Sequence, residues 1–389
     1  MAGSIEKRGN NSYRLIVSLG YGPDGKRIKK TKTVKANGKR EAEKLLAQFV
    51  TEVEAGEYIA PEKMLFSRFV EEWESKYAKK NLSPSTLTTY KHHLKNHILP
   101  YFGHKNLDKI SPMSVITFLN DLSEPGRRKD GKEASLSTAT VEYNHRILKN
   151  IFQRATEWKV IKVSPLQDIK KPKVHQRETG VYNQEEAKLL LARLKSESLM
   201  WQVFIHLAIT TGMRRGELIG LEWDHVDFIG NTIHIKQSLT YVNGEYIIKE
   251  PKTKNSKRTV AIPENVMDML KIYYEKWRAN KEGCANVWAE GNHCFLFTAF
   301  NGKPLHPSSV KNWWNRFIRK NELKYIRFHD LRHTSASLLI NKGVHMKVIS
   351  NRLGHADIRT TMNIYGHVLQ DAEKAAANQF DDIFDSETK

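Results

Sequence analysis

The sequence predicts a multidomain, mainly helical protein with a small α+β unit at its N-terminus. At 389 residues the chain is too long for one ordinary compact core. Strand-like alternation is confined to the first 35 residues and to the region 232–263. The segment 170–180 is basic, contains proline and lacks apolar periodicity, which is typical of a linker. We therefore expect an α+β domain at residues 1–58, an all-α domain at 63–174, and a mainly α domain with a small antiparallel sheet at 181–389.

The first domain is expected to be a β-ribbon covered by one helix. Residues 12–19 (SYRLIVSL) alternate as a strand does, and the Gly-Pro-Asp-Gly sequence at 22–25 is a strong turn signal. A second strand, rich in lysine, arginine and threonine, is expected at 26–35, and apolar residues at 39–54 have helical spacing. The ribbon is therefore two- or three-stranded with a helix on one face.

Positive charge is concentrated on this ribbon. Residues 1–50 contain 12 Lys and Arg against 4 Asp and Glu, a net charge of +8. A charged strand is often only a solvated face, but a basic β-ribbon also fits the major groove of DNA. We favour DNA contact, and the candidate residues are Tyr13, Arg14, Lys26, Arg27, Lys29 and Lys32.

The second domain is expected to consist of helices. Ser83-Pro84 and Ser111-Pro112 each place a capping serine before a proline at the first helical position. A longer amphipathic helix is expected at 136–158. His93 and His97 have the i, i+4 spacing of a metal pair, but no acidic or cysteine ligand flanks them. We therefore expect exposed or phosphate-facing histidines there and no metal site.

The charge of the whole chain predicts a polyanionic partner. Lys and Arg number 63 against 43 acidic residues, a net of +20, so nucleic acid is the default partner. No apolar run approaches the roughly 20 residues of a membrane helix. The N-terminus lacks the apolar stretch of a secretory signal. Cys284 and Cys294 are too few for a disulfide framework, so we expect free thiols in a reducing cytoplasm.

Two candidate site segments lie before residue 260. Arg214 and Glu217 stand three residues apart at a predicted helix start, in TGMRRGEL, and can share a helix face. A structural ion pair is the simplest interpretation of these two residues alone. Lys252 and Lys254 lie in PKTKNSKRT, which we interpret as a basic hairpin turn between strands at 246–249 and 260–262. Taken alone, this turn indicates either a solvated loop or a phosphate contact.

Two further segments follow toward the C-terminus. His329 and Arg332 lie in HDLRHT at a helix start, on a different face from the buried stripe of that helix. An imidazole beside a guanidinium favours anion binding. His355 follows Leu-Gly, and Tyr365 stands ten residues later in NIY. A single tyrosine on an amphipathic helix is usually a core residue, so this last segment is weak evidence on its own.

The combination of these segments is more specific than any one of them. In this order, and with the local sequences TGMRRGEL, PKTKNSKRT, HDLRHT, LGH and NIY, the chain resembles the tyrosine recombinase family. The resemblance extends over the whole length, to integrases of temperate phages and conjugative transposons. It implies a tyrosine recombinase fold with an arm-site-binding domain, a helical core-binding domain and a catalytic domain.

The resemblance also implies a role for each residue. Tyr365 is the expected nucleophile, and Arg214 and Arg332 are expected to stabilise the charge that builds on the phosphate. His329 and His355 either donate hydrogen bonds to that phosphate or take the tyrosine proton. Lys252, with Lys254 as the alternative, would donate a proton to the leaving 5′-oxygen, and Glu217 would orient the active-site residues. The expected product is a 3′-phosphotyrosyl link, formed without metal, nucleotide or other cofactor.

Partners and rival functions follow from the same comparison. The expected partners are double-stranded DNA at core and arm attachment sites, further copies in a tetramer, and an accessory excision factor, all in a bacterial cytoplasm. A type IB topoisomerase uses the same nucleophile but has no reason to carry residues 1–58. A chromosome-dimer-resolving recombinase also lacks such a domain. A non-catalytic DNA-binding regulator is disfavoured because all six chemical positions are present.

Overall fold

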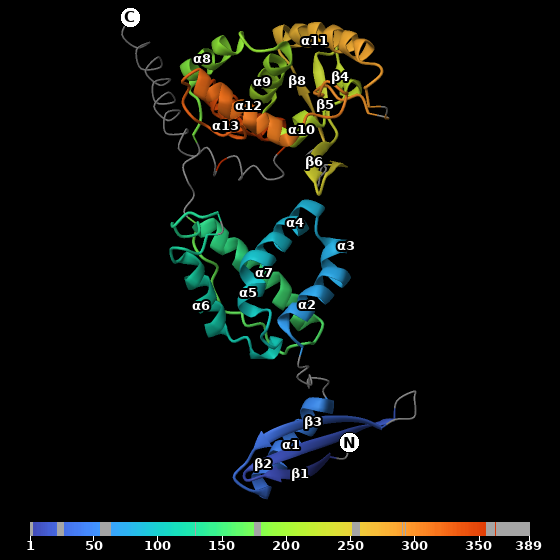
Figure 1. Cartoon of the computed structure of the whole chain (residues 1–389), viewed down its shortest axis with the longest axis vertical. Helices are drawn as coiled ribbons and strands as arrows, with labels where there is room; N and C mark the ends of the chain where they lie inside the picture. Colours follow the sequence, from blue (N-terminus) through green and yellow to red (C-terminus); the bar gives the residue numbers. More distant parts are fainter. Residues whose placement is uncertain are drawn as a thin grey trace, which may run out of the picture. The chain divides into compact units, whose positions relative to one another are not determined.

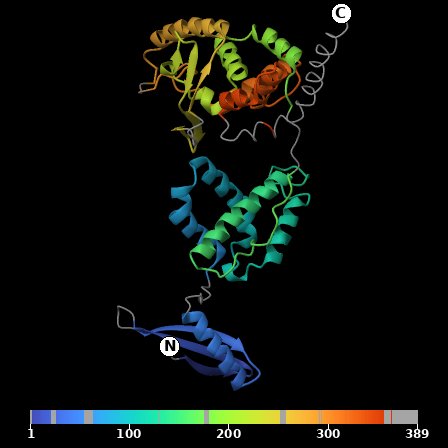
Figure 2. The same cartoon turned by 180° about the vertical axis from the view of Figure 1, so that it is seen from behind.

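The chain forms two compact units, residues 1–176 and 177–389, and each is described by itself. A computed structural model describes residues 3–21, 27–54, 64–128, 130–174, 180–250, 257–289, 291, 293–354 and 362. Figure 1 and Figure 2 show the elements of each unit from opposite sides. No helix among these residues is long and apolar enough to cross a membrane.

The N-terminal part of the first unit is a three-stranded antiparallel sheet with one covering helix (Figure 2). The strands β1 (Gly3–Gly9), β2 (Ser12–Tyr21) and β3 (Arg27–Lys35) are in sequential order, and α1 spans Lys39–Glu54. Alternate residues of β2, including Leu15 and Val17, are fully buried against Phe49 of α1. The opposite face of β2, which includes Arg14 and Ser18, stays half-exposed.

The rest of the first unit is a helical bundle with its own hydrophobic core. The serine caps predicted before α4 and α6 are present, because Ser83 accepts a hydrogen bond from Thr86 N and Ser111 from Ser114 N. Ser137 caps the longest helix in the same way. The helices are α2 (Phe66–Trp73), α3 (Lys79–Asn81), α4 (Pro84–His93), α5 (Leu99–Phe102), α6 (Pro112–Ser123) and α7 (Thr138–Glu157), with π turns at Glu74–Ala78 and Leu94–Ile98.

The second unit combines helices with two small antiparallel sheets. One sheet has the order β4-β5-β8, and the other is the β6-β7 hairpin. Its strands are β4 (Val226–Asp227), β5 (Thr232–Ile235), β6 (Ser238–Val242), β7 (Glu245–Lys249) and β8 (Arg258–Ala261). Its helices are α8 (Gln184–Leu194), α9 (Leu199–Thr211), α10 (Arg215–Ile219), α11 (Glu264–Gly283), α12 (Pro307–Lys320), α13 (Asp330–Asn341) and α14 (Met346–Leu353). The α+β, all-α and mainly α composition predicted from the sequence is confirmed.

The strand pairing around residue 252 differs from the sequence interpretation. We expected strands at 246–249 and 260–262 to form one hairpin, but β7 pairs with β6, and β8 pairs with β5. Asn243 and Gly244 both have positive φ, 53° and 91°, as a tight two-residue hairpin turn requires. That turn brings Tyr246 opposite Tyr241 and leaves β8 to the other sheet.

Candidate active site

The turn between α9 and α10 places the first predicted catalytic residue. Helix α9 ends at Gly212, which has a left-handed φ of 62°. A Cβ atom at this position would collide with the side chain of Leu353, so glycine permits both the turn and the close packing of α14. The chain then turns into α10, with Arg214 as an extended N-cap residue. Arg214 is thereby delivered to the surface where α9 and α14 meet.

Glu217 holds Arg214 in place. Its carboxylate accepts a hydrogen bond from the Arg214 backbone N–H at 2.9 Å and another from the Arg214 guanidinium at 2.8 Å. The Glu217 side chain is only 4% exposed, whereas that of Arg214 is 42% exposed. The ion pair therefore fixes the base of Arg214 and leaves the guanidinium accessible to a ligand. This is more than the structural ion pair that the two residues alone suggested.

A second arginine, Arg258, reaches Glu217 from β8. Its Nη2 lies 3.0 Å from Glu217 Oε2, and its side chain is 6% exposed. Burial acts to raise the pKa of Glu217, but the ion pairs with Arg258 and Arg214 outweigh it and hold that pKa below its usual value. Sequence reasoning missed Arg258. The signal available was strand alternation, which puts Arg258 on the same side as the buried Val260 and therefore points a charge inward.

Arg332 is buried rather than presented on an open face of α13. The residue is 4% exposed, and it donates to the carbonyl oxygens of Gly212 at 2.7 Å and Leu353 at 2.6 Å. These carbonyls end α9 and α14, where a helix dipole favours a cation. The expectation that Arg332 lies away from the buried side of α13 is therefore corrected, because Arg332 ties together the helix ends that flank Arg214. Its contact with an anion stays a prediction.

His329 begins the same helix and reaches the surface. Loss of solvent around its ring lowers the pKa of His329, and the positive charges of Arg332 and Arg214 lower it further. Burial, with the neighbouring His329, likewise lowers the pKa of His333 to about 4. Both imidazoles are therefore neutral near pH 7. A neutral His329 can donate a hydrogen bond from one nitrogen and accept a proton on the other.

A small basic pocket adjoins His329. It has a volume of about 400 Å³, and its lining includes Arg215, Lys311 and Arg327 together with His329. Arg327 also makes a two-pronged ion pair with the buried Asp330, at 2.9 and 2.8 Å, which fixes the start of α13. The surface beside His329 is therefore suited to an anionic ligand.

Four predicted catalytic residues lie outside the described residues: Lys252, Lys254, His355 and Tyr365. The described chain approaches two of them closely. The described stretch 293–354 stops one residue before His355, and β8 starts at Arg258, four residues after Lys254. Among the predicted residues, the structure brings together Arg214, Glu217, His329 and Arg332.

The predicted DNA contacts of the ribbon divide between its two faces. Tyr13 is 8% exposed and packs with Ala36 and Ala42, on the face that α1 covers. Lys32 pairs with Leu15 across the strands and forms an ion pair with Glu52 of α1 at 3.1 Å. The Tyr13 ring is therefore part of the core of the fold, and the expectation that it is exposed for DNA contact is corrected. Lys32 lies on the face that α1 covers but its side chain is 39% exposed, so its DNA contact stays a prediction.

The remaining candidates lie on the face that α1 leaves open. Arg14 is on the other side of β2 from Leu15, and Lys29 lies opposite Ser18 on that side. Arg27 donates to the Ser18 hydroxyl at 2.8 Å. Lys26 lies outside the described residues. The open face thus keeps three of the six predicted contacts.

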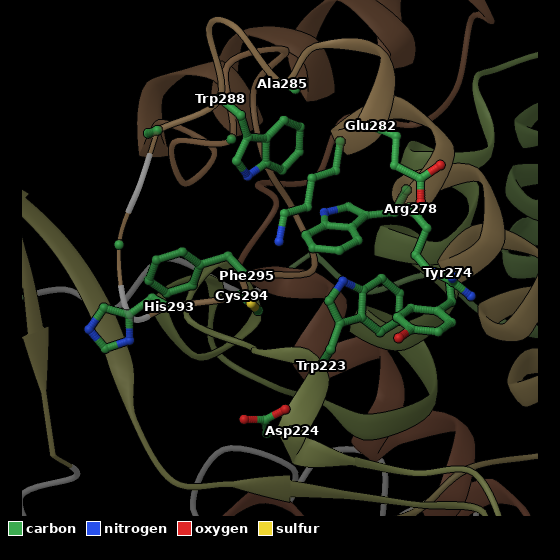
Figure 3. Close-up of a pocket in the computed structure, with 15 residues that line it drawn as sticks. Trp223, Asp224, Tyr274, Arg278, Glu282, Ala285, Trp288, His293, Cys294 and Phe295 are labelled. Carbon is green, nitrogen blue, oxygen red and sulfur yellow. The ribbon is translucent and has the colours of Figure 1, made fainter.

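A larger pocket in the second unit contains none of the predicted catalytic residues. It has a volume of about 770 Å³, and its wall includes Trp223, Tyr274 and Trp288 (Figure 3). His293 at its edge pairs with Glu222 at 2.9 Å. Because the pocket lies among other elements and its lining contains no predicted catalytic residue, we do not assign the chemistry of the site to it.

Comparison with known proteins identifies the family. Residues 181–371 match the model of the phage integrase family, and residues 65–123 match that of the phage integrase N-terminal SAM-like domain. The chain is 27% identical to the ICEBs1 integrase of Bacillus subtilis over 382 residues, which covers 98% of this chain and 100% of that protein. The chain therefore belongs to the phage integrase family of tyrosine recombinases, the site-specific enzymes that cleave and rejoin DNA.

Solved structures share the fold. The Tn1549 transposon integrase in complex with circular intermediate DNA has a TM-score of 0.67 at 21% identity, covering 82% of this chain and 100% of that one. The lambda integrase tetramer bound to a Holliday junction has a TM-score of 0.54 at 18% identity, covering 91% of this chain and 95% of that one. The tyrosine recombinase fold expected from the sequence is confirmed.

Proposed function

We propose that this chain is an integrase that inserts a mobile DNA element into a bacterial chromosome and excises it through a 3′-phosphotyrosyl intermediate. One observation carries the proposal. Four predicted catalytic residues come together where α9 and α14 end and α13 begins: Arg214, Glu217, His329 and Arg332. Along the sequence, His355 follows directly after the glycine that ends α14. The full-length similarity to the ICEBs1 integrase supports the mobile-element role.

The proposed cleavage step uses these groups as follows. The Tyr365 oxygen bonds to phosphorus, the bond to the 5′-oxygen breaks, and Lys252 or Lys254 protonates that oxygen. His329 or His355 takes the tyrosine proton, which is needed because a phenol has a pKa near 10. Arg214 contacts the non-bridging oxygens with its accessible guanidinium. Arg332 adds positive charge beside Arg214 and holds the site together, because it donates hydrogen bonds to the carbonyls at the ends of the two helices that flank the site.

Rejoining reverses the cleavage on another strand. A free 5′-hydroxyl attacks the phosphotyrosyl phosphorus and releases Tyr365, so one phosphodiester is exchanged for another. The bond energy is stored in the intermediate, and no nucleotide is consumed.

The domains have proposed roles in placing this chemistry on DNA. Residues 1–58 would bind arm sites, and residues 63–174, with the catalytic domain 181–389, would clamp the core site. The lambda integrase tetramer on a Holliday junction supports assembly of four copies of this chain on two DNA sites. We propose that the protein acts in the bacterial cytoplasm and that an accessory factor promotes excision.

The direct test is covalent capture on a suicide duplex. A duplex carrying the core site and a nick beside the cleavage point should trap the protein, because the short released strand diffuses away. Mass spectrometry of the trapped peptide should place the phosphate on Tyr365. Relaxation of supercoiled plasmids without sequence preference, and no recombination between two sites, would instead favour a topoisomerase.

Chelation is expected to leave cleavage unchanged. The proposed chemistry relies on guanidinium, imidazole and lysine groups for charge neutralisation and proton transfer, so it has no step for a divalent ion. Adduct yield on the suicide duplex should be the same in excess EDTA and in Mg²⁺ without nucleotide. Complete loss of the adduct in EDTA, restored by Mg²⁺, would contradict the phosphotyrosyl mechanism and favour a metal-dependent nuclease.

A further inference from the structure

Arg258 makes contacts in two directions from one buried position. Its Nη2 pairs with Glu217 Oε2 at 3.0 Å, and its Nε donates to the backbone carbonyl of Arg352 at 2.7 Å. The first contact reaches the carboxylate that holds Arg214. The second reaches the last turn of α14, which leads to His355. One guanidinium therefore joins β8 to two segments that carry proposed catalytic residues.

Arg258 is closely packed against the end of α14. A Cβ atom added at Gly354 would lie 2.9 Å from Arg258 Nη1, so the glycine at the end of α14 gives the guanidinium its space. Arg352 donates in turn to the carbonyls of Thr210 and Ala261, which are close to the ends of α9 and β8. The ends of α9, β8 and α14 are thus tied by arginine-to-carbonyl hydrogen bonds, with Arg332 completing the set.

We infer that Arg258 is a positioning residue of the proposed active site, which sets Arg214 through Glu217 and sets the entry to the His355 segment through the α14 carbonyl. This inference rests on the proposed function. Arg258 does not need to touch DNA for this role, because its side chain is buried under Glu217 and α14.

The charge balance at Glu217 supplies a signature of this role. Among the described residues, Glu217 forms ion pairs with Arg214, the N-cap residue of its own helix, and with Arg258 from β8. Strand β6, which packs on α10, presents the Ser238 hydroxyl and Leu239 there. Without Arg258, burial would raise the pKa of Glu217. At low pH the carboxyl would be neutral and release Arg214, and at high pH it would be charged and hold it.

The test compares Arg258→Met and Arg258→Lys with the wild-type protein. We expect Arg258→Met to bind the core site within about threefold of wild type but to cleave roughly 100-fold more slowly near pH 7, because a small displacement of a catalytic group has such a cost. Because loss of Arg258 raises the pKa of Glu217, the deficit should be largest at low pH and shrink as the pH is raised and Glu217 regains its charge. The cleavage rate of Arg258→Lys should lie between those of wild type and Arg258→Met, since a lysine keeps the charge but cannot make both contacts.

Two further variants control the experiment. Arg278→Met removes an arginine that is 52% exposed on α11 and should cleave like wild type. Arg258→Met combined with Glu217→Gln should cleave slowly with the pH profile of wild type, because the titrating carboxyl is gone. This double variant also leaves no unpaired buried carboxylate, so it keeps the test available if Arg258→Met alone does not fold.

The outcomes separate this inference from the function on which it rests. Wild-type protein that forms no adduct on the suicide duplex would contradict the proposed function. If wild-type protein forms the adduct and the Arg258→Met variant cleaves normally, the positioning role alone is overturned. The same holds if that variant loses binding and cleavage equally and its pH profile is unchanged.

Discussion

Replacement of Tyr365 by phenylalanine is expected to abolish DNA cleavage and to leave core-site binding within about twofold of wild type. The substitution removes the one oxygen that attacks phosphorus and keeps the ring, so binding is unaffected while the covalent step has no nucleophile. Single-turnover reactions on the nicked duplex should show no adduct above background. Electrophoretic mobility shifts on an intact core-site duplex should report unchanged affinity.

Tyr241→Phe is the matched control for this prediction. Tyr241 lies in β6 of the same unit, is 39% exposed, and packs its ring on Tyr246 and His306. Loss of its hydroxyl should change neither adduct formation nor binding. An adduct formed by the Tyr365→Phe protein would move the nucleophile to another residue, and loss of binding in that variant would show that Tyr365 acts through DNA contact.

The fold class and much of the site could be predicted because their signals are local. Ser83-Pro84 and Ser111-Pro112 marked helix starts that the structure confirms, since a capping hydroxyl and a ring-fixed φ act within one turn. Arg214 and Glu217 are three residues apart, so their pairing also follows from helical geometry.

What could not be predicted depends on distant parts of the chain. The Arg258–Glu217 pair spans 41 positions and arises only when β8 joins β5 beside α10. Arg332 is buried against backbone carbonyls 120 and 21 positions away in the chain. The sequence of side chains does not show where such backbone acceptors will lie. The composition of the ribbon also could not show which of its faces α1 covers, so the ion pair between Lys32 and Glu52 of α1 was not predicted.

The two faces of the ribbon yield the last prediction, on arm-site recognition. Replacing Arg14 and Lys29 together by alanine should weaken binding to arm-site DNA roughly tenfold or more. It should also reduce the slope of log affinity against log salt by about two, because binding releases fewer counterions from the DNA when two phosphate contacts are lost. Both residues lie on the sheet face that α1 leaves open, where a ribbon can enter a major groove. Footprinting of the full-length protein on DNA flanking the crossover site provides the measurement.

Lys32→Ala is the control on the opposite face, and it removes one positive charge where the double substitution removes two. Its ammonium is paired with Glu52, and both side chains are partly exposed, so the loss should cost the fold no more than about 1 kcal/mol. Arm-site affinity should then stay within about twofold of wild type, and adduct formation at the core site should be normal in both variants. If Lys32→Ala instead lowers the salt slope by about one, half of the change expected for the double variant, then net charge and not the open face governs binding. In that case the ribbon would be a solvated surface that attracts DNA without reading it.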